Sequence, residues 1–177
     1  DTFKEGFWVQ IGNYVLRNED GTLTKHGSTF KASTRSKFYG KNLDRIIEGR
    51  LANKINQGFI DSLYDFEEVR LEDFLQRRSL NRPLEDYVSQ TDMMIGLTEQ
   101  GKGIGIEPLV GTTYQYYRTK GNYTLKELVK DKSELDVRYY WDIISNQLRK
   151  FGLDEWIKKV PPITIIDKKQ KSLMDWI

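Results

Sequence analysis

The fold is decided by two neighbouring stretches: residues 7–30, FWVQIGNYVLRNEDGTLTKHGSTF, and residues 43–55, LDRIIEGRLANKI. In the first, apolar and aromatic residues alternate along the chain, and Asn18 to Gly21 supplies residues suited to a tight turn. A β-hairpin is expected, with its return strand running from Thr22 towards Phe30 and a break near Gly27. In the second, apolar residues recur at the spacing of one helix face: Leu43, Ile47, Leu51 and Ile55.

Shorter elements are expected after this helix. Apolar spacing and turn residues predict helices over 59–66, 71–79 and 93–99 and a strand over 110–118. Gly58 is expected to interrupt the helical run, and Pro83 marks a bend. Asp92 is suited to cap the third of these helices, and Gly101 is suited to end it.

The last long helix has the clearest amphipathic pattern. It is expected to begin at Ser133 or Asp136 and to stop at Gly152. Its apolar stripe comprises Val137, Tyr140, Trp141, Ile144, Leu148 and Phe151. Pro161 and Pro162 then break the regular structure ahead of a C-terminal tail. The sequence thus predicts an α+β fold, with an N-terminal hairpin, a mainly helical region containing a short strand insertion, and a flexible tail.

Composition narrows the class of protein. The 177 residues are 38% hydrophobic and 12% aromatic, which is too apolar for a disordered chain and too dispersed for a membrane span. There is no cysteine, and no signal-like segment opens the chain, so an intracellular location is expected. The single histidine, His26, cannot assemble a zinc site and is expected in a surface turn.

A net charge of +2 conceals a marked asymmetry. Residues 25–54 contain eight Lys or Arg against Asp44 and Glu48, whereas residues 61–99 contain ten acidic residues against four Arg. A surface that binds phosphates is therefore expected to be local rather than to cover the whole chain. The alternative interpretation, a solvated helix that carries many basic side chains, is favoured on charge alone.

The last eight residues form a short motif with a physical use. Gln170, Leu173, Trp176 and Ile177 have the spacing of a peptide that docks on a DNA sliding clamp. One helical turn would bring the three apolar side chains to one side as a plug for a shallow pocket, while the glutamine binds in a polar notch. Alternatively, the tryptophan packs on its own domain. The position after a Pro-Pro break favours an accessible peptide.

Taken together, the segments resemble the C-terminal portion of a family B DNA polymerase of the archaeal type. The resemblance extends over nearly the whole chain and rests on the order of its pieces. They are FKEGFWV at 3–9, YVL at 14–16 with the turn at 20–21, RPL at 82–84 with Tyr87, GIEP at 105–108, LDVRYY at 135–140, and the pairs at 147–148 and 151–152. The terminal peptide falls where archaeal members carry a motif that binds the clamp, PCNA.

This resemblance implies a division of the chain and a division of labour. Residues 1–32 would be the palm-edge hairpin, 33–160 the thumb and 161–177 the clamp-binding tail. In the family, palm aspartates with Mg²⁺ perform nucleotidyl transfer, while the thumb grips primer-template duplex. Those aspartates would precede Asp1, so this chain is expected to be inactive alone and to work with a catalytic portion or large subunit. Its other partners would be double-stranded DNA and PCNA, and no membrane.

The resemblance also assigns DNA-contact residues. They are Tyr14, Lys31, Ser33, Thr34, Arg35, Lys37 and Arg82, each of which could instead be a surface or capping residue. The family usually carries two lysines shortly before its palm tyrosine, where this chain has Ile11, Gly12 and Asn13. Two alternatives therefore stay open: a polymerase-derived clamp scaffold without synthesis, and a helical interaction domain whose peptide matches by chance.

Overall fold

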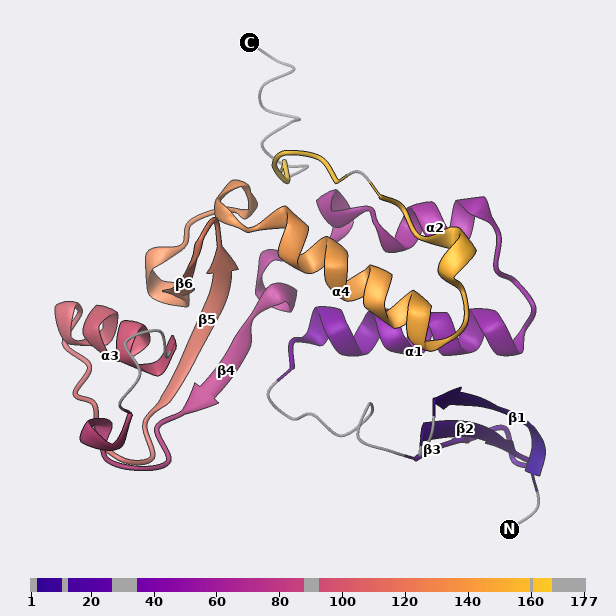
Figure 1. Ribbon diagram of the computed structural model, residues 1–177, viewed down its shortest axis with the longest axis horizontal. Helices are drawn as coiled ribbons and strands as arrows, with labels where there is room; N and C mark the ends of the chain where they lie inside the picture. The colour runs from indigo at the N-terminus through magenta and orange to yellow at the C-terminus, as the bar shows by residue number, and fades with distance from the viewer. Residues whose placement is uncertain (1–2, 11–12, 27–34, 88–92, 160, 167–177) are drawn as a thin grey trace. The chain divides into compact units, whose positions relative to one another are not determined.

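The computed structural model describes residues 3–10, 13–26, 35–87, 93–159 and 161–166, and the fold is α+β, as predicted (Figure 1). No helix in these ranges is long and apolar enough to span a bilayer. The chain divides into two compact units. The first comprises Asp1–Ser33, Tyr39–Asp65 and Tyr140–Pro161, and the second comprises Thr34–Phe38, Phe66–Tyr139 and Pro162–Ile177.

The first unit opens with an antiparallel sheet in the order β1 (Phe3–Gln10), β2 (Asn13–Asn18) and β3 (Leu23–His26). Sequence alone predicted a single hairpin, but the chain reverses between β1 and β2 as well, which adds a strand. The predicted turn before β3 is confirmed, with Gly21 at φ 87° and its amide donating to the Asn18 carbonyl at 3.0 Å. The expected break near Gly27 lies outside the described residues.

Helix α1 (Lys37–Leu51) confirms the clearest helical pattern but ends before Ile55. Asn53 takes a positive φ of 53°, and the Lys54 amide donates to the Gly49 carbonyl at 2.8 Å, which closes the helix. Ile55 then turns back towards α1, where a β-carbon on Gly49 would lie 3.0 Å from the Ile55 Cδ1 atom. The prediction that Ile55 lies in the helix is therefore wrong. Ile55 has the four-residue spacing of the helix face, but it packs on α1 from the chain that follows the helix.

Helix α2 (Gln57–Leu63) begins at Asn56, whose side-chain oxygen accepts a hydrogen bond from the Phe59 amide at 2.9 Å. Gly58 lies inside the first turn of α2 and does not interrupt a longer helix. The asparagine cap, five residues after the end of α1, starts a new helix at that point.

Helix α4 (Val137–Lys150) is confirmed in nearly every respect. All six residues of its predicted stripe are buried. The Asp136 carboxylate accepts from the Tyr139 amide at 3.2 Å, so the helix begins at Asp136 rather than at Ser133. Gly152 ends it at φ 71°.

Within the first unit, polar contacts fix α4 to α1 and α2. The Tyr64 hydroxyl lies 2.8 Å from Ser145 Oγ, and the Gln147 side chain donates to the Tyr39 carbonyl at 2.9 Å. The Arg50 guanidinium donates to the Phe151 carbonyl beyond the last turn of α4. These bonds satisfy groups that the helical core removes from water.

The second unit is built on the antiparallel sheet β4 (Gln76–Ser79), β5 (Thr113–Thr119) and β6 (Asn122–Leu125). The predicted helix over 71–79 is wrong. A 3₁₀ turn at Leu71–Phe74 leads directly into β4, which pairs with β5 from Gln76↔Tyr116 to Ser79↔Thr113. The pairing of β4 with β5, some forty residues later in the chain, outweighs the local helical spacing.

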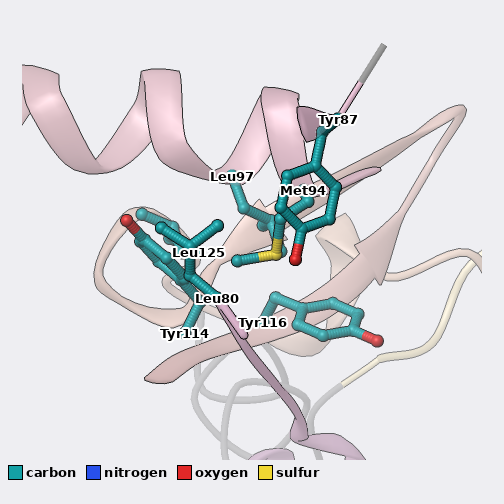
Figure 2. Packing of buried hydrophobic residues seen from close by; sticks show 7 residues of the cluster. All are labelled: Leu80, Tyr87, Met94, Leu97, Tyr114, Tyr116 and Leu125. Carbon is teal, nitrogen blue, oxygen red and sulfur yellow. The ribbon is translucent and has the colours of Figure 1, made fainter. Parts of the chain in front are cut away.

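Helix α3 (Met93–Gly103) covers one face of this sheet through an apolar cluster (Figure 2). The cluster contains Leu80, Tyr87, Met94, Leu97, Tyr114, Tyr116 and Leu125. Gly101 does not end α3 as predicted. It is buried within the helix, where a β-carbon would approach the Tyr114 ring to 3.1 Å, so its glycine permits close packing of β5. The expected cap, Asp92, is outside the described residues.

Candidate nucleic-acid interface

Much of the positive charge between residues 25 and 54 serves the structure of the first unit. Lys25 pairs with Asp44 at 2.5 Å, and the neighbouring strand's Arg17 pairs with Glu48 at 3.3 Å. The Arg45 guanidinium donates to Ser62 Oγ and lies 5.7 Å from the centre of the Phe59 ring. Its partial burial lowers the pKa of Arg45. Lys25 and Arg45, like Arg50, are therefore weak candidates for phosphate contact.

The predicted DNA-contact residues Arg35 and Lys37 both have exposed side chains at the start of the second unit. Lys37 is the first residue of α1, where a cation opposes the helix dipole and adds nothing to helix stability. The charge of Lys37 also affects Glu72. The pKa of Glu72 is lowered first by its own backbone amide, then by Arg70, and to a smaller extent by Lys37. Lys31, Ser33 and Thr34 lie outside the described residues.

Arg82 is exposed in the loop that follows β4. Its guanidinium carbon lies 4.5 Å from the centre of the Tyr87 ring, a cation–π distance. Hydrogen bonds from the Leu80 amide to the Thr112 carbonyl at 2.9 Å and from the Gly111 amide to the Leu80 carbonyl at 2.7 Å hold the base of this loop. Arg82 thus braces Tyr87, and stacking on a ring leaves the N–H edges of a guanidinium able to bind an anion.

Tyr14 lies in β2 of the first unit, and its side chain is partly exposed. It stacks on His26 of β3 with ring centroids 4.8 Å apart and an interplanar angle of 10°. His26 occupies a strand rather than the turn expected for it. Sequence reasoning missed this pair, although a turn centred on residue 20 would set residues 14 and 26 opposite each other.

The second unit also contains an aromatic and cationic cluster that the sequence did not single out. The Arg118 guanidinium lies 4.4 Å from the Tyr123 ring centre and 5.8 Å from that of Tyr139, and its Nε lies 3.6 Å from an Asp136 oxygen. Burial, with smaller effects of Tyr139 and Tyr123, raises the pKa of Tyr116 to about 12. This cluster links β5 to the start of α4, and no position of it was predicted to be functional.

The clamp-docking residues Gln170, Leu173, Trp176 and Ile177 lie outside the described residues. The segment ahead of them is anchored on the second unit. Ile165 is 1% exposed, and Thr164 Oγ1 donates to the Ser133 carbonyl at 3.2 Å. Thr164 and Ile165, which belong to the predicted tail, therefore pack on the second unit.

The predicted contact residues that the structure describes fall in both units. Tyr14 belongs to the first unit, whereas Arg35, Lys37 and Arg82 belong to the second. No group of three or more His, Asp or Glu side chains gathers as metal ligands within the described ranges. What the arrangement offers is exposed cations and one exposed aromatic stack, which suit contacts with phosphates and bases.

Comparison with known proteins finds a likeness in structure alone. No protein-family model matches the sequence, and no curated protein matches it. The family B DNA polymerase from the hyperthermophilic archaeon Pyrobaculum calidifontis matches 89% of this chain with a TM-score of 0.64 and 16% sequence identity. The fold is polymerase-like. The match covers only 22% of the length of that polymerase chain.

Proposed function

We propose that this chain is the palm-edge and thumb part, or a small subunit, of a family B DNA-directed DNA polymerase. It grips primer-template duplex and tethers the polymerase to a sliding clamp. The observation that supports the proposal most is the polymerase-like fold over 89% of the chain. The order of elements agrees with it, since a small N-terminal sheet precedes a region of helices with a second sheet.

The grip is assigned to exposed cations near the boundary between hairpin and helices. Arg35 and Lys37 are exposed, and Lys31, Ser33 and Thr34 are their neighbours in sequence. Phosphate contacts from such side chains position a protein on duplex without reading its sequence, and they release counterions. Arg82 of the second unit would contribute a guanidinium, and Tyr14 of the first unit a phenol, to contacts with DNA.

The chemistry of synthesis belongs, in this proposal, to a catalytic portion that carries the palm aspartates and Mg²⁺. Two metal ions held by those aspartates would stabilise the attacking and leaving oxygens of nucleotidyl transfer. This chain would hold the product duplex and keep the primer terminus close to that site. It is therefore expected to bind DNA without extending it.

The clamp tether is assigned to Gln170, Leu173, Trp176 and Ile177. Ile165, within the tail of residues 161–177, is buried and serves as an anchor, and eleven residues follow Ile166. At roughly 3.3–3.6 Å per residue, a fully extended tail would reach at most about 40 Å from that anchor. A tether of this length would raise the local concentration of clamp beside the second unit.

Two binding assays test the proposal. Wild-type chain should bind a primer-template more tightly than a single strand of equal length. It should also bind PCNA, and the double variant Leu173→Ala, Trp176→Ala should lose that binding. A matched control is Leu109→Ala, Val110→Ala, which removes two large apolar side chains that are 62% and 60% exposed elsewhere. Equal PCNA affinity for both double variants would rule out the docking motif.

A second candidate function is a clamp-binding scaffold derived from a polymerase. The observation in its favour is Ile11, Gly12 and Asn13, which stand near where the family usually places its palm lysines. A scaffold should bind PCNA through the same tail while showing no preference for primed over blunt duplex. A measured preference for primed over blunt duplex would favour the polymerase part, and its absence would favour the scaffold.

A further inference from the structure

Strand β4 forms one edge of the sheet in the second unit (Figure 1). The opposite edge, β6, is closed by a side chain of α3. The Gln100 side-chain amide donates to the Tyr123 carbonyl at 2.8 Å, and its oxygen accepts from the Leu125 amide at 2.9 Å. An open edge strand can pair with another extended chain, so the two edges of this sheet differ in what they can bind.

The register of β4 determines which of its backbone groups point outward. The Leu80 amide donates to the Thr112 carbonyl at 2.9 Å, so this pair, at the end of the ladder, is a hydrogen-bonded one. Because hydrogen-bonded and non-hydrogen-bonded pairs alternate in an antiparallel ladder, Arg77 and Ser79 belong to pairs that do not bond to β5. Their N–H and C=O groups therefore face the outer edge of β4.

These outward backbone groups have no hydrogen-bond partner within the ranges that the structure describes. Arg77 and Ser79 each offer one donor and one acceptor, in the spacing that an added strand uses. The Ser79 hydroxyl bonds within the sheet, at 2.8 Å from Thr113 Oγ1, and so does not compete for these groups. The edge of β4 is therefore ready to accept the backbone of another strand.

The side chain beside this edge is a cation. Arg77 is exposed and shares a sheet face with Ser79, directly opposite Gln115. The apolar cluster under α3 uses Tyr114 and Tyr116 of the other face. Among the described residues, no carboxylate forms an ion pair with the Arg77 guanidinium. An acidic side chain opposite Arg77 on an added strand would therefore find an unused partner.

Charge decides among the chains that could add to this edge. In the two antiparallel registers that overlap most of β4 with β4 of a second copy, Arg77 stands opposite Arg77 or Arg78 opposite Arg78. Like charges directly opposite destabilise a strand pair. The C-terminal segment of this chain, with Lys168, Lys169 and Lys171, would meet Arg77 with like charge as well. An extended acidic peptide has the complementary charge.

We propose that the outer edge of β4 is a docking site for an extended acidic peptide of a partner protein, which adds to the sheet as a fourth strand. The peptide backbone bonds to the amides and carbonyls of Arg77 and Ser79, and an Asp or Glu directly opposite Arg77 pairs with its guanidinium. The competing explanation is an edge cation that only keeps other strands away. The site uses none of the residues assigned to DNA or the clamp, so it does not rest on the polymerase proposal.

The test uses the ¹⁵N-labelled full chain and an octapeptide of alternating glutamate and valine. In the added strand, a glutamate opposite Arg77 uses its own N–H to reach β4, whereas the valine N–H groups point away from the sheet. N-methylation of the glutamates should therefore abolish binding, and N-methylation of the valines should leave it unchanged. The matching lysine and valine octapeptide should not bind.

Two matched pairs of variants locate the site. Arg77→Glu should lose the glutamate peptide and gain the lysine peptide, whereas Lys120→Glu, an exposed cation in the turn between β5 and β6, should change neither. Ser79→Pro removes an outward N–H and should abolish binding, whereas Ser79→Ala keeps that N–H and should bind as wild type does. Arg77→Ala should weaken the glutamate peptide by up to about 5-fold, as expected for one cross-strand charge pair.

The amide resonances of Arg77 and Ser79 should shift and become protected from hydrogen exchange when the glutamate peptide binds. No binding of this peptide, or binding that N-methylation of its glutamates does not reduce, would overturn strand addition. Shifts of the same resonances with protein concentration alone would assign the edge to a second copy and would also overturn the proposal. If the proline disturbs β4, the charge reversal at Arg77 still decides.

Primer-template and PCNA binding should be the same in Ser79→Pro and Ser79→Ala. Failure of the peptide site is therefore distinguishable from failure of the proposed polymerase function.

Discussion

Removing the hydroxyl of Tyr114 should stabilise the protein. Tyr114 is 2% exposed, and its hydroxyl has no hydrogen-bond partner within the described structure. Burial alone raises its pKa, in keeping with a phenol taken from water without compensation. Tyr64 is the matched control, because it is also buried, at 5% exposed, and its hydroxyl lies 2.8 Å from Ser145 Oγ.

The expected magnitudes have opposite signs. A buried hydroxyl without a hydrogen-bond partner destabilises the folded state by about 1–3 kcal/mol. Removing its oxygen leaves a small void, which offsets part of the stability gained. Tyr114→Phe should therefore raise the free energy of unfolding by about 1 kcal/mol. Tyr64→Phe breaks a bond and leaves Ser145 buried without it, which should lower that free energy by about 1–2 kcal/mol.

Urea unfolding at pH 7, followed by circular dichroism, measures both variants. One kcal/mol corresponds to a shift of the midpoint temperature of roughly 2–4 °C in a chain of this size, so a thermal scan gives an independent reading. If Tyr114→Phe were as destabilising as Tyr64→Phe, the assignment of an uncompensated hydroxyl in the β5 cluster would be refuted.

Three further predictions concern pH, backbone and core. Burial raises the pKa of Tyr117 to about 12, so the neutral phenol favours the folded state. This stability should be present below about pH 10 and lost as the pH rises through 12, and Tyr117→Phe should reduce the alkaline loss in urea titrations by the share that Tyr117 contributes, while Tyr116 keeps its own share. Gly152→Ala should destabilise by about 1 kcal/mol because its φ is 71°, whereas Gly96→Ala, on an open helix surface, should be neutral or stabilising when both are melted. Ile144→Ala should cost about 2–5 kcal/mol in the same assay, because its side chain is 0% exposed.

The sequence correctly predicted the elements that are specified by capping residues, turn residues and apolar spacing within a few positions of the element itself. Helix α4 has a capping aspartate, an unbroken apolar stripe and a terminal glycine, and each was found where expected. The turn before β3 was equally predictable, because the requirement for a positive φ at Gly21 is local.

Tertiary contacts decided the elements that sequence reasoning missed. Residues 76–79 have no strong intrinsic preference for a strand. They form β4 because their backbone pairs with the antiparallel strand β5. Gly101 has the typical residue type for a helix terminus, but its small size is used to admit Tyr114. A single sequence does not distinguish these two uses of glycine.

The candidate interface was predictable in its residue types and less so in its partners. Charge counting identified the stretch from Lys25 to Lys54 but could not show that Asp44 would pair with Lys25, or that Ser62 and Phe59 would bind Arg45. Strand register, which depends on the turn, was needed to set Tyr14 against His26. The DNA-contact and clamp-docking assignments stay predictions.

The salt dependence of primer-template binding tests the central claim most directly. The triple variant Lys31→Ala, Arg35→Ala, Lys37→Ala is compared with Lys120→Ala, Lys126→Ala, Lys130→Ala, which removes the same charge from three exposed lysines. If the first three contact phosphates, the slope of log K against log salt should fall in magnitude by up to about 2.7, with a much smaller change in the control. An unchanged affinity and slope in the first triple variant would contradict a duplex grip by this part of the chain.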